Sequence, residues 1–264
     1  MKIWAVSNQK GGVGKTTTVV SLAGLLSSWG FRVLLVDLDP HGSLSSYFGL
    51  DPDGLKASVY NLFHDASQKK AINTEAYIRK TKFENISILP ASTAIATLDR
   101  QVASMGGMGL VVSNALKKVS SQYDYVIIDS PPMLGVLMIN ALASCQHLLI
   151  PTLAEFLALK GLERMLHTFD MVFHSRKVKP VCTIVPTMFD KRTRAARESL
   201  VALKNAYPDQ VWEGYIPVDT KIRDASQAGI PVSLFVKNSK AADAYAELLE
   251  TLLQDDIDHD RKMA

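Results

Sequence analysis

The sequence predicts an α/β domain in which helices cover both faces of a mostly parallel, twisted β-sheet, giving an α/β/α sandwich of three layers. Two observations support this fold class. Short runs of apolar, largely β-branched residues recur along the chain, separated by longer segments with helical periodicity. Polar residues do not alternate with apolar ones inside these runs, so both faces of each expected strand must be covered.

Six short apolar runs are the expected strands. They cover residues 3–6, 33–36, 86–89, 125–128, 148–150 and 181–185. Crossover helices are expected between them, because apolar residues recur at helical spacing in residues 16–29, 155–173 and 241–253. Residues 42–84 contain shorter helical patterns, at 59–63 and 74–80, and are expected to decorate the sheet. A cluster of glycines at 106–109 predicts a break in helical sequence.

The composition is that of an ordinary globular protein. With 264 residues, 47% hydrophobic and 21% charged, the chain is too apolar to be disordered. It is also long enough to form a stable core without disulfides or bound metals. We expect one domain over residues 1–254 and a charged, frayed tail at 255–264. No secretory signal or apolar stretch of roughly 20 residues is present, which predicts a cytoplasmic protein without a transmembrane segment.

A glycine-rich segment at residues 8–17 directly follows the first expected strand and precedes a helix. Such a loop surrounds phosphate oxygens with backbone amides, its lysine reaches the β- and γ-phosphates, and its threonine holds Mg²⁺. The residues expected at the phosphates are Gly11, Gly12, Val13, Gly14, Lys15, Thr16 and Thr17. The order strand, glycine loop, Gly-Lys-Thr and helix predicts a nucleotide-binding P-loop.

Carboxylates stand at the ends of two further strands. Asp37 and Asp39 follow the second expected strand, and Asp129 follows the strand at 125–128. A buried strand end is a costly place for a carboxylate unless the carboxylate meets a cation. Asp129 is therefore expected to be the Walker B residue that holds Mg²⁺ through water.

The loop also departs from the general P-loop pattern, because Gln9 stands where a glycine is usual and a second lysine, Lys10, lies inside the loop. This deviant Walker A sequence, complete from Lys10 to Thr16, resembles that of the ParA/MinD family of dimeric ATPases. Further segments of the chain follow the patterns of small ParA proteins, so the resemblance covers almost the whole sequence. They are residues 123–132, 151–162, 187–193 and 216–231.

The resemblance implies a P-loop ATPase that uses ATP and Mg²⁺. It implies that Lys10 acts in trans on the partner subunit's ATP, that Asp39 positions the attacking water, and that Asp37 supports the magnesium region. Lys15 joins Lys10 and Asp39 in the implied catalytic set. The base is expected near Pro186, Thr187 and Pro217.

One departure from the family lies beside Asp39. The usual continuation Pro-Gln-Gly-Asn is replaced by Pro40-His41-Gly42-Ser43. We interpret His41 as a loop residue that replaces an amide rather than as a catalytic base, because a base needs a held geometry.

A basic segment suggests where the protein meets DNA. Residues 176–204 contain eight cations and two acids: Arg176, Lys177, Lys179, Lys191, Arg192, Arg194, Arg197 and Lys204 against Asp190 and Glu198. A localised basic face attracts phosphates without sequence preference. The resemblance to small ParA proteins points to Arg192 and Lys221 as DNA-binding residues. Val218 replaces a further arginine, for which Arg194, Arg197 and Arg223 could compensate.

The resemblance implies a molecular switch. ATP drives formation of a homodimer, the dimer associates with nucleoid DNA or a scaffold, and a ParB-like or other adaptor stimulates hydrolysis. The cargo is either a plasmid or chromosome, or a protein assembly such as a chemotaxis array at the cell pole. A MinD-like or flagellar-number regulator fits less well, because the tail is acidic where a basic membrane helix is needed. A metabolic ligase of the dethiobiotin synthetase kind has no use for Lys10.

Overall fold

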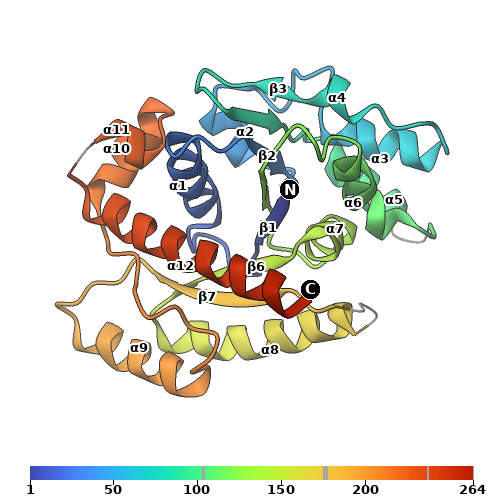
Figure 1. The fold of residues 1–264 in the computed structure, drawn as a ribbon. Coiled ribbons are helices and arrows are strands. Elements are labelled where there is room, and N and C mark those ends of the chain that lie inside the picture. The colour runs from blue at the N-terminus through green and yellow to red at the C-terminus, as the bar shows by residue number, and fades with distance from the viewer. Residues whose placement is uncertain (103–104, 175–177, 237, 264) are drawn as a thin grey trace.

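Seven strands form a single sheet with helices on both faces (Figure 1). The computed structural model describes residues 1–102, 105–174, 178–236 and 238–263. The strands are β1 (Lys2–Val6), β2 (Val33–Asp37), β3 (Arg79–Lys80), β4 (Ile86–Leu89), β5 (Tyr125–Asp129), β6 (His147–Leu153) and β7 (Val181–Thr187). Their order is β3-β4-β2-β5-β1-β6-β7, and all neighbours are parallel except β3, which is antiparallel to β4. The predicted fold class and all six predicted strands are confirmed.

The helices connect these strands and form the two outer layers. They are α1 (Lys15–Ser28), α2 (Ser43–Tyr47), α3 (Val59–Ser67), α4 (Thr74–Tyr77), α5 (Ile95–Val102), α6 (Val111–Lys117), α7 (Val136–Ser144), α8 (Phe156–Phe173), α9 (Arg194–Ala206), α10 (Thr220–Ala228), α11 (Val232–Phe235) and α12 (Lys240–Met263), with a 3₁₀ turn η1 at Met108–Leu110. The turn η1 lies within the glycine cluster at which a helix break was predicted, and its N-cap residue Gly107 has φ of 85°.

Successive residues of each strand belong to different layers. In β2, the side chains of Leu34 and Val36 join the core formed with α3 and α5–α9, whereas Val33 and Leu35 pack with α1, α2 and α10–α12. All four are fully buried. Burial on both faces explains why the strand is apolar without alternation.

One short segment differs from the prediction. The pattern of residues 74–80 predicts a helix, but α4 ends at Tyr77, and Arg79 and Lys80 pair with Ile88 and Ser87 of β4. The open edge of β4 offers backbone hydrogen bonds that compete with a further helical turn. The result is the edge strand β3.

The C-terminal segment also differs from the expectation of a frayed tail at 255–264, because α12 continues to Met263. Its last turns dock on the amino end of β1. Asp256 is buried and accepts a hydrogen bond of 3.1 Å from Trp4 Nε1, and Lys2 pairs with Asp260. The many charged residues of this segment suggest a solvated tail, but one face of the helix contacts Trp4 and Lys2 of β1. Within the described ranges, no helix is both long and apolar enough to span a membrane.

Candidate nucleotide-binding site

Three adjacent strands end together at one edge of the sheet. β5 lies between β1 and β2, and the pairing places Val6 and Asp37 in register with Asp129. The glycine loop follows β1 directly, so it meets both carboxylates at the carboxyl ends of the strands. Ligands of open α/β sheets bind at this edge.

The conformation of the loop explains its glycines. Gly12 and Gly14 have φ of 72° and 91°, in the left-handed region that side chains disfavour. A Cβ atom at either position meets nothing within 4 Å, so backbone conformation and not lack of space demands glycine. Gly14 leads directly into α1, whose N-terminus contributes backbone N–H groups and partial positive charge for a phosphate.

The start of the loop is held by Asn8. Its Nδ2 donates to the Pro151 carbonyl at 2.7 Å, and its Oδ1 accepts from the Lys10 amide at 2.9 Å. The side chain is buried. No local pattern marks Asn8 as important, because its partner Pro151 is 143 residues away in the sequence.

The loop borders a hollow of about 510 Å³. Residues predicted from the sequence line it: Gly11, Gly12, Gly14, Lys15, Thr16, Thr17 and Asp39. The hollow is also lined by residues that the sequence did not predict at the site: Ser43, Tyr47, Pro132, Met188 and Ser226. Lys15 is largely buried, with its Nζ 3.4 Å from the carbonyl of Lys10. The lysine is therefore held inside the loop, where phosphates would lie.

Thr16 and the two strand-end carboxylates form a set of oxygen ligands. Thr16 Oγ1 donates to Asp129 Oδ2 at 2.6 Å, while Asp129 Oδ1 is buried without a hydrogen-bond partner among the described residues. Asp37 Oδ2 accepts from both the amide and the hydroxyl of Ser45, at 2.8 and 2.7 Å. An unpartnered buried carboxylate oxygen beside a threonine hydroxyl fits Mg²⁺, which prefers oxygen ligands.

The proximity of the two carboxylates changes their acidity. Burial raises the pKa of Asp37 to about 7. Burial, followed by the charge of Asp37, raises the pKa of Asp129 to about 8. Two carboxylates in one buried site resist joint ionisation until a cation arrives. The part of the chain that the structure describes has no group of three or more His, Cys, Asp or Glu side chains suited to a metal.

The loop after β2 brings Asp39 and His41 to the hollow. The side chain of Asp39 is 15% exposed and that of His41 is 81% exposed. His41 Nδ1 lies 2.8 Å from Asp39 Oδ1. His41 is therefore a loop residue in contact with the expected water-positioning residue.

Lys10 is part of the loop but does not line the hollow. Its ammonium group lies 3.1 Å from Glu155 Oε2, and both side chains are largely exposed. Lys10 therefore extends from the mouth of the site toward solvent, whereas Lys15 is directed into the loop.

The residues expected near the base lie apart from the hollow. Thr187 is buried and its Oγ1 donates to the Val13 carbonyl at 2.8 Å, so its side chain supports the loop. Pro186 is buried within β7, and Pro217 lines another surface depression. Met188, which is half-exposed with φ of 51°, lines the hollow, whereas the predicted residues Pro186 and Thr187 do not.

Three of the candidate DNA-binding residues lie at the start of α9. Arg192 pairs with Asp190 at 2.7 Å and Arg194 pairs with Glu198 at 2.6 Å. Arg197 Nη1 donates to the carbonyl of Lys191. These ion pairs neutralise part of the charge counted in the sequence.

The other two candidates, Lys221 and Arg223, are exposed on α10, and within the described residues neither has an ion pair. Arg192 nevertheless lines the same surface depression as Pro217 and Val218, so the segment leading into α10 lies close to the start of α9. Arg176 and Lys177, counted in the basic segment, lie outside the described residues.

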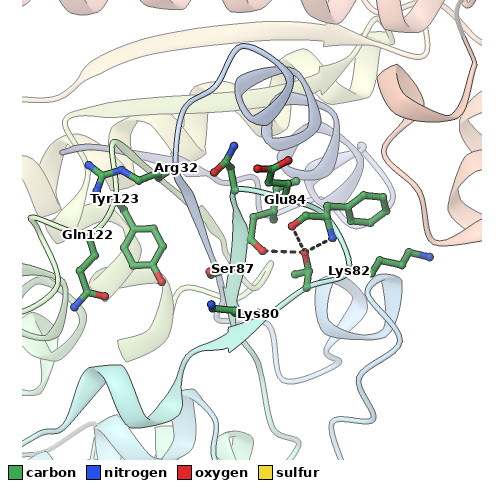
Figure 2. Close-up of a pocket in the computed structure, with 11 residues that line it drawn as sticks. Arg32, Lys80, Lys82, Glu84, Ser87, Gln122 and Tyr123 are labelled. Atoms are coloured by element: carbon green, nitrogen blue, oxygen red, sulfur yellow. Dashed lines mark hydrogen bonds between the residues drawn. The ribbon is translucent and has the colours of Figure 1, made fainter.

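A second hollow, of about 610 Å³, lies at the amino ends of β4 and β5 (Figure 2). Its Arg32 is already bound by Asp124 through contacts of 2.8 and 3.1 Å. Thr81 Oγ1 donates a hydrogen bond to the Ile86 carbonyl at 2.8 Å and accepts one from the Phe83 amide at 3.1 Å. No glycine is among its described lining residues. This hollow lacks the features of a phosphate site and lies at the opposite end of the strands.

Comparison with known proteins gives the site its context. A family model described as an AAA domain matches residues 1–180. The sporulation initiation inhibitor protein Soj of Bacillus subtilis is 35% identical over 248 residues, which are 94% of this chain and 96% of Soj. The chromosome partitioning protein ParA of Myxococcus xanthus is 32% identical over 259 residues, covering 97% of this chain and 89% of that protein.

One solved structure shares the fold and contains an ATP analogue and magnesium. The crystal structure of cobyrinic acid a,c-diamide synthase from Mycobacterium smegmatis with bound ATP analogue and magnesium has a TM-score of 0.81 and 34% sequence identity, over 96% of this chain and 95% of that chain. The glycine loop, Thr16 and the unpartnered oxygen of Asp129 fit the same ligands. The chain is therefore a member of the ParA/MinD family of P-loop ATPases and uses ATP and Mg²⁺.

Proposed function

We propose that this ATPase is a molecular switch: ATP drives homodimer formation, the dimer associates with DNA or a protein scaffold, and an adaptor protein stimulates hydrolysis to release it. The cycle would segregate or position a cargo. Similarity to a chromosome partitioning protein supports this proposal.

The direction of Lys10 is the observation that carries the proposal. A loop lysine that served its own subunit would be expected among the residues lining the hollow, as Lys15 is. Lys10 is instead exposed and pairs with Glu155 at the surface. A second subunit facing this edge of the sheet could receive the ammonium group at its own phosphates. A cation there would stabilise charge on the transferred phosphoryl group.

The other residues divide the work of hydrolysis. The loop amides and Lys15 bind the phosphates, and Thr16 with Asp129 and Asp37 would hold Mg²⁺. Bound Mg²⁺ neutralises charge on the phosphate oxygens. Asp39, at the border of the hollow, would orient the attacking water. Closure of the hollow by a partner subunit would exclude bulk water from these groups.

The test of the switch compares the two loop lysines. ATP turnover per protomer, measured over a range of protein concentrations, is expected to rise with concentration, because a dimer completes the site. Lys15→Ala should lose ATP binding. Lys10→Ala should retain ATP binding and lose turnover by about 100-fold, the usual cost of removing a transition-state charge contact. Analytical ultracentrifugation with a non-hydrolysable ATP analogue reports dimer formation.

Two results would contradict the proposal. Turnover per protomer that is independent of concentration, with a monomer in the presence of the analogue, rules out the dimer. Full turnover in Lys10→Ala rules out the trans role of this lysine. Lys191→Ala is the matched control, because Lys191 is another exposed loop lysine but lies outside the phosphate loop. It should bind and hydrolyse ATP normally.

DNA association can be tested by charge reversal on two surfaces. Arg192→Glu with Lys221→Glu should abolish retention on DNA without changing ATP affinity. Lys80→Glu with Lys82→Glu reverses two charges at the hollow of Figure 2 and should leave retention unchanged. Binding of the unaltered protein should weaken steeply with salt. An equal loss of DNA retention in both double variants would mean that Arg192 and Lys221 do not form a specific DNA-binding surface.

The cargo can be identified by partner capture. Asp39→Ala loaded with ATP should accumulate as the active complex, and Lys15→Ala serves as the empty control. Selective recovery of a centromere-type DNA-binding adaptor would indicate DNA segregation. Recovery of chemoreceptor-array or polar scaffold proteins would indicate positioning of that assembly.

Similarity to the cobyrinic acid a,c-diamide synthase structure supports one alternative. In that case, the chain would be a ligase that uses ATP to activate a small carboxylic acid. The two functions differ in what ATP consumption requires. A switch should hydrolyse ATP in buffer containing only Mg²⁺, whereas a ligase should consume ATP only when its acid and amine substrates are added.

A further inference from the structure

The loop after β2 holds Asp39 through two contacts with one residue. Asp39 Oδ1 accepts a hydrogen bond from the His41 amide at 3.0 Å and lies 2.8 Å from His41 Nδ1. For the second contact to be a hydrogen bond, Nδ1 carries the ring proton. Both contacts therefore converge on the same carboxylate oxygen.

The loop itself has little freedom around these contacts. The Gly42 amide donates to the Asp39 carbonyl at 2.8 Å, and Gly42 has φ of 62°. A Cβ atom on Gly42 would lie 2.2 Å from Pro52 Cγ. The backbone from Asp39 to Gly42 is thus closed into a tight turn that keeps His41 within reach of Asp39.

The second carboxylate oxygen has a different environment. Among the residues that the structure describes, no donor is found for Asp39 Oδ2, while the side chain as a whole is only 15% exposed. With Oδ1 occupied twice, rotation of the carboxylate would break both contacts. Asp39 lines the nucleotide hollow, so its remaining oxygen is the one available to a water molecule there.

We propose that His41 is a positioning residue for hydrolysis: its Nδ1–H holds Asp39 Oδ1 and leaves Oδ2 to orient the attacking water. This inference rests on the proposed role of Asp39. In this role His41 acts through Asp39 rather than on the reacting atoms. It acts by fixing the carboxylate, since small displacements of a positioned group cost catalysis heavily.

The chemistry of the side chain provides a sharp set of variants. Nδ1 is bonded to Cγ, so asparagine places an N–H donor at the same distance from the backbone, whereas glutamine places its donor one atom further out. His41→Asn should therefore retain the contact with Asp39, His41→Gln should retain it poorly, and His41→Ala should lose it. Because the ring of His41 is 81% exposed, these substitutions remove little packing and the variants should fold.

The experiment measures kcat and KM for ATP at a fixed protein concentration, with thermal melting as the check on folding. His41→Ala should lower kcat by about 10- to 100-fold. KM should change less than about twofold, because the phosphate loop supplies the binding contacts. His41→Asn should restore kcat to near that of the unaltered protein. Added to Asp39→Ala, His41→Ala should cause no further loss, because both changes remove one function.

The outcomes separate this inference from the proposed function. If Asp39→Ala hydrolyses ATP at the normal rate, the role of Asp39 in the proposed function is wrong. If Asp39→Ala is slow but His41→Ala is normal, only the inference about His41 is wrong. The inference is also overturned if His41→Asn is as slow as His41→Ala, or if the losses in kcat multiply in the double variant.

Discussion

Asp37 and Asp129 belong to different strands, yet they meet in register in the sheet. Their pKa values are raised to about 7 and about 8, with burial as the main cause. In the unfolded chain both groups titrate near 4. Between about pH 4 and pH 8, the folded protein binds more protons than the unfolded chain, so its stability falls as pH rises. The site is therefore a source of instability at neutral pH until Mg²⁺ and nucleotide arrive.

This linkage predicts the behaviour of Asp129→Asn without nucleotide or Mg²⁺. The unaltered protein should lose stability between pH 5.5 and pH 8.5, because both carboxylates are forced to ionise in a buried site. The variant should lose less, since residue 129 then carries no charge to bury, while Asp37 remains buried beside Asp39. Each kcal/mol difference corresponds to roughly 2–4 °C in Tm for a chain of this size. Differential scanning calorimetry at the two pH values measures it.

Asp209→Asn provides the control, because Asp209 is exposed. Its melting temperature should follow that of the unaltered protein at both pH values. Addition of Mg²⁺ and ATP should raise the Tm of the unaltered protein at pH 8.5 by more than that of Asp129→Asn. Equal pH dependence in Asp129→Asn and the unaltered protein would contradict the shifted pKa values.

Among the elements, α1 links the phosphate loop to α10–α12 in the same layer of helices. It begins at Lys15 and packs against α11 so closely that a Cβ atom on Gly24 would lie 2.4 Å from Pro231 Cβ. The segment between α10 and α11 also contacts α2, whose last residue, Tyr47, donates its hydroxyl to the Ile230 carbonyl at 2.8 Å. The segment between α10 and α11 is thus held against both α1 and α2.

A pair of helical glycines tests how much this close packing matters. Gly24→Ala in α1 should destabilise the protein by about 1–3 kcal/mol, because the new methyl group overlaps Pro231. Gly161→Ala in α8 should stabilise it by up to about 1 kcal/mol, because a Cβ there meets nothing within 4 Å and alanine favours helix. Urea denaturation of both variants measures the difference. Stabilisation by both substitutions would mean that α11 moves aside at no cost.

At the scale of the whole molecule, the two ends of the chain are joined. Trp4 of β1 donates to Asp256 of α12, and Lys2 pairs with Asp260. The same region holds His147, which is buried, with Nε2 2.7 Å from Thr183 Oγ1 and Nδ1 3.8 Å from Asp256 Oδ1. The last turns of α12 therefore contact β1 and β6 directly, and β7 through His147, near the amino ends of these strands.

Truncation provides the test of this connection. A chain ending at residue 254 lacks Asp256 and leaves Trp4 Nε1 without its partner, which should cost about 1.5–3 kcal/mol, as for a hydrogen bond to a charged group. A chain ending at residue 260 keeps both contacts and should be nearly as stable as the full chain. Urea denaturation of the two truncated chains distinguishes these cases. Equal stability of the two would support the frayed tail that the charge pattern suggests.

The fold class, the phosphate loop and the strand-end carboxylates could be predicted from the sequence because their signals are local. A buried parallel strand is apolar throughout, and Gly11 to Thr16 are contiguous, so each is visible without knowledge of its neighbours in space. The short strand β3 could not be predicted in this way. Arg79 and Lys80 are extended only because the edge of β4 lies beside them.

The sequence by itself determined which chemical groups the site contains and the layered class of the fold. Only the tertiary structure decided which groups meet: Asp37 with Asp129, Asn8 with Pro151, and Asp256 with Trp4. The physical reason is that these contacts depend on the strand order, which joins segments distant in the chain. Local periodicity carries no information about that order. Burial and the raised carboxylate pKa values follow from the same contacts, so they too belong to the tertiary structure.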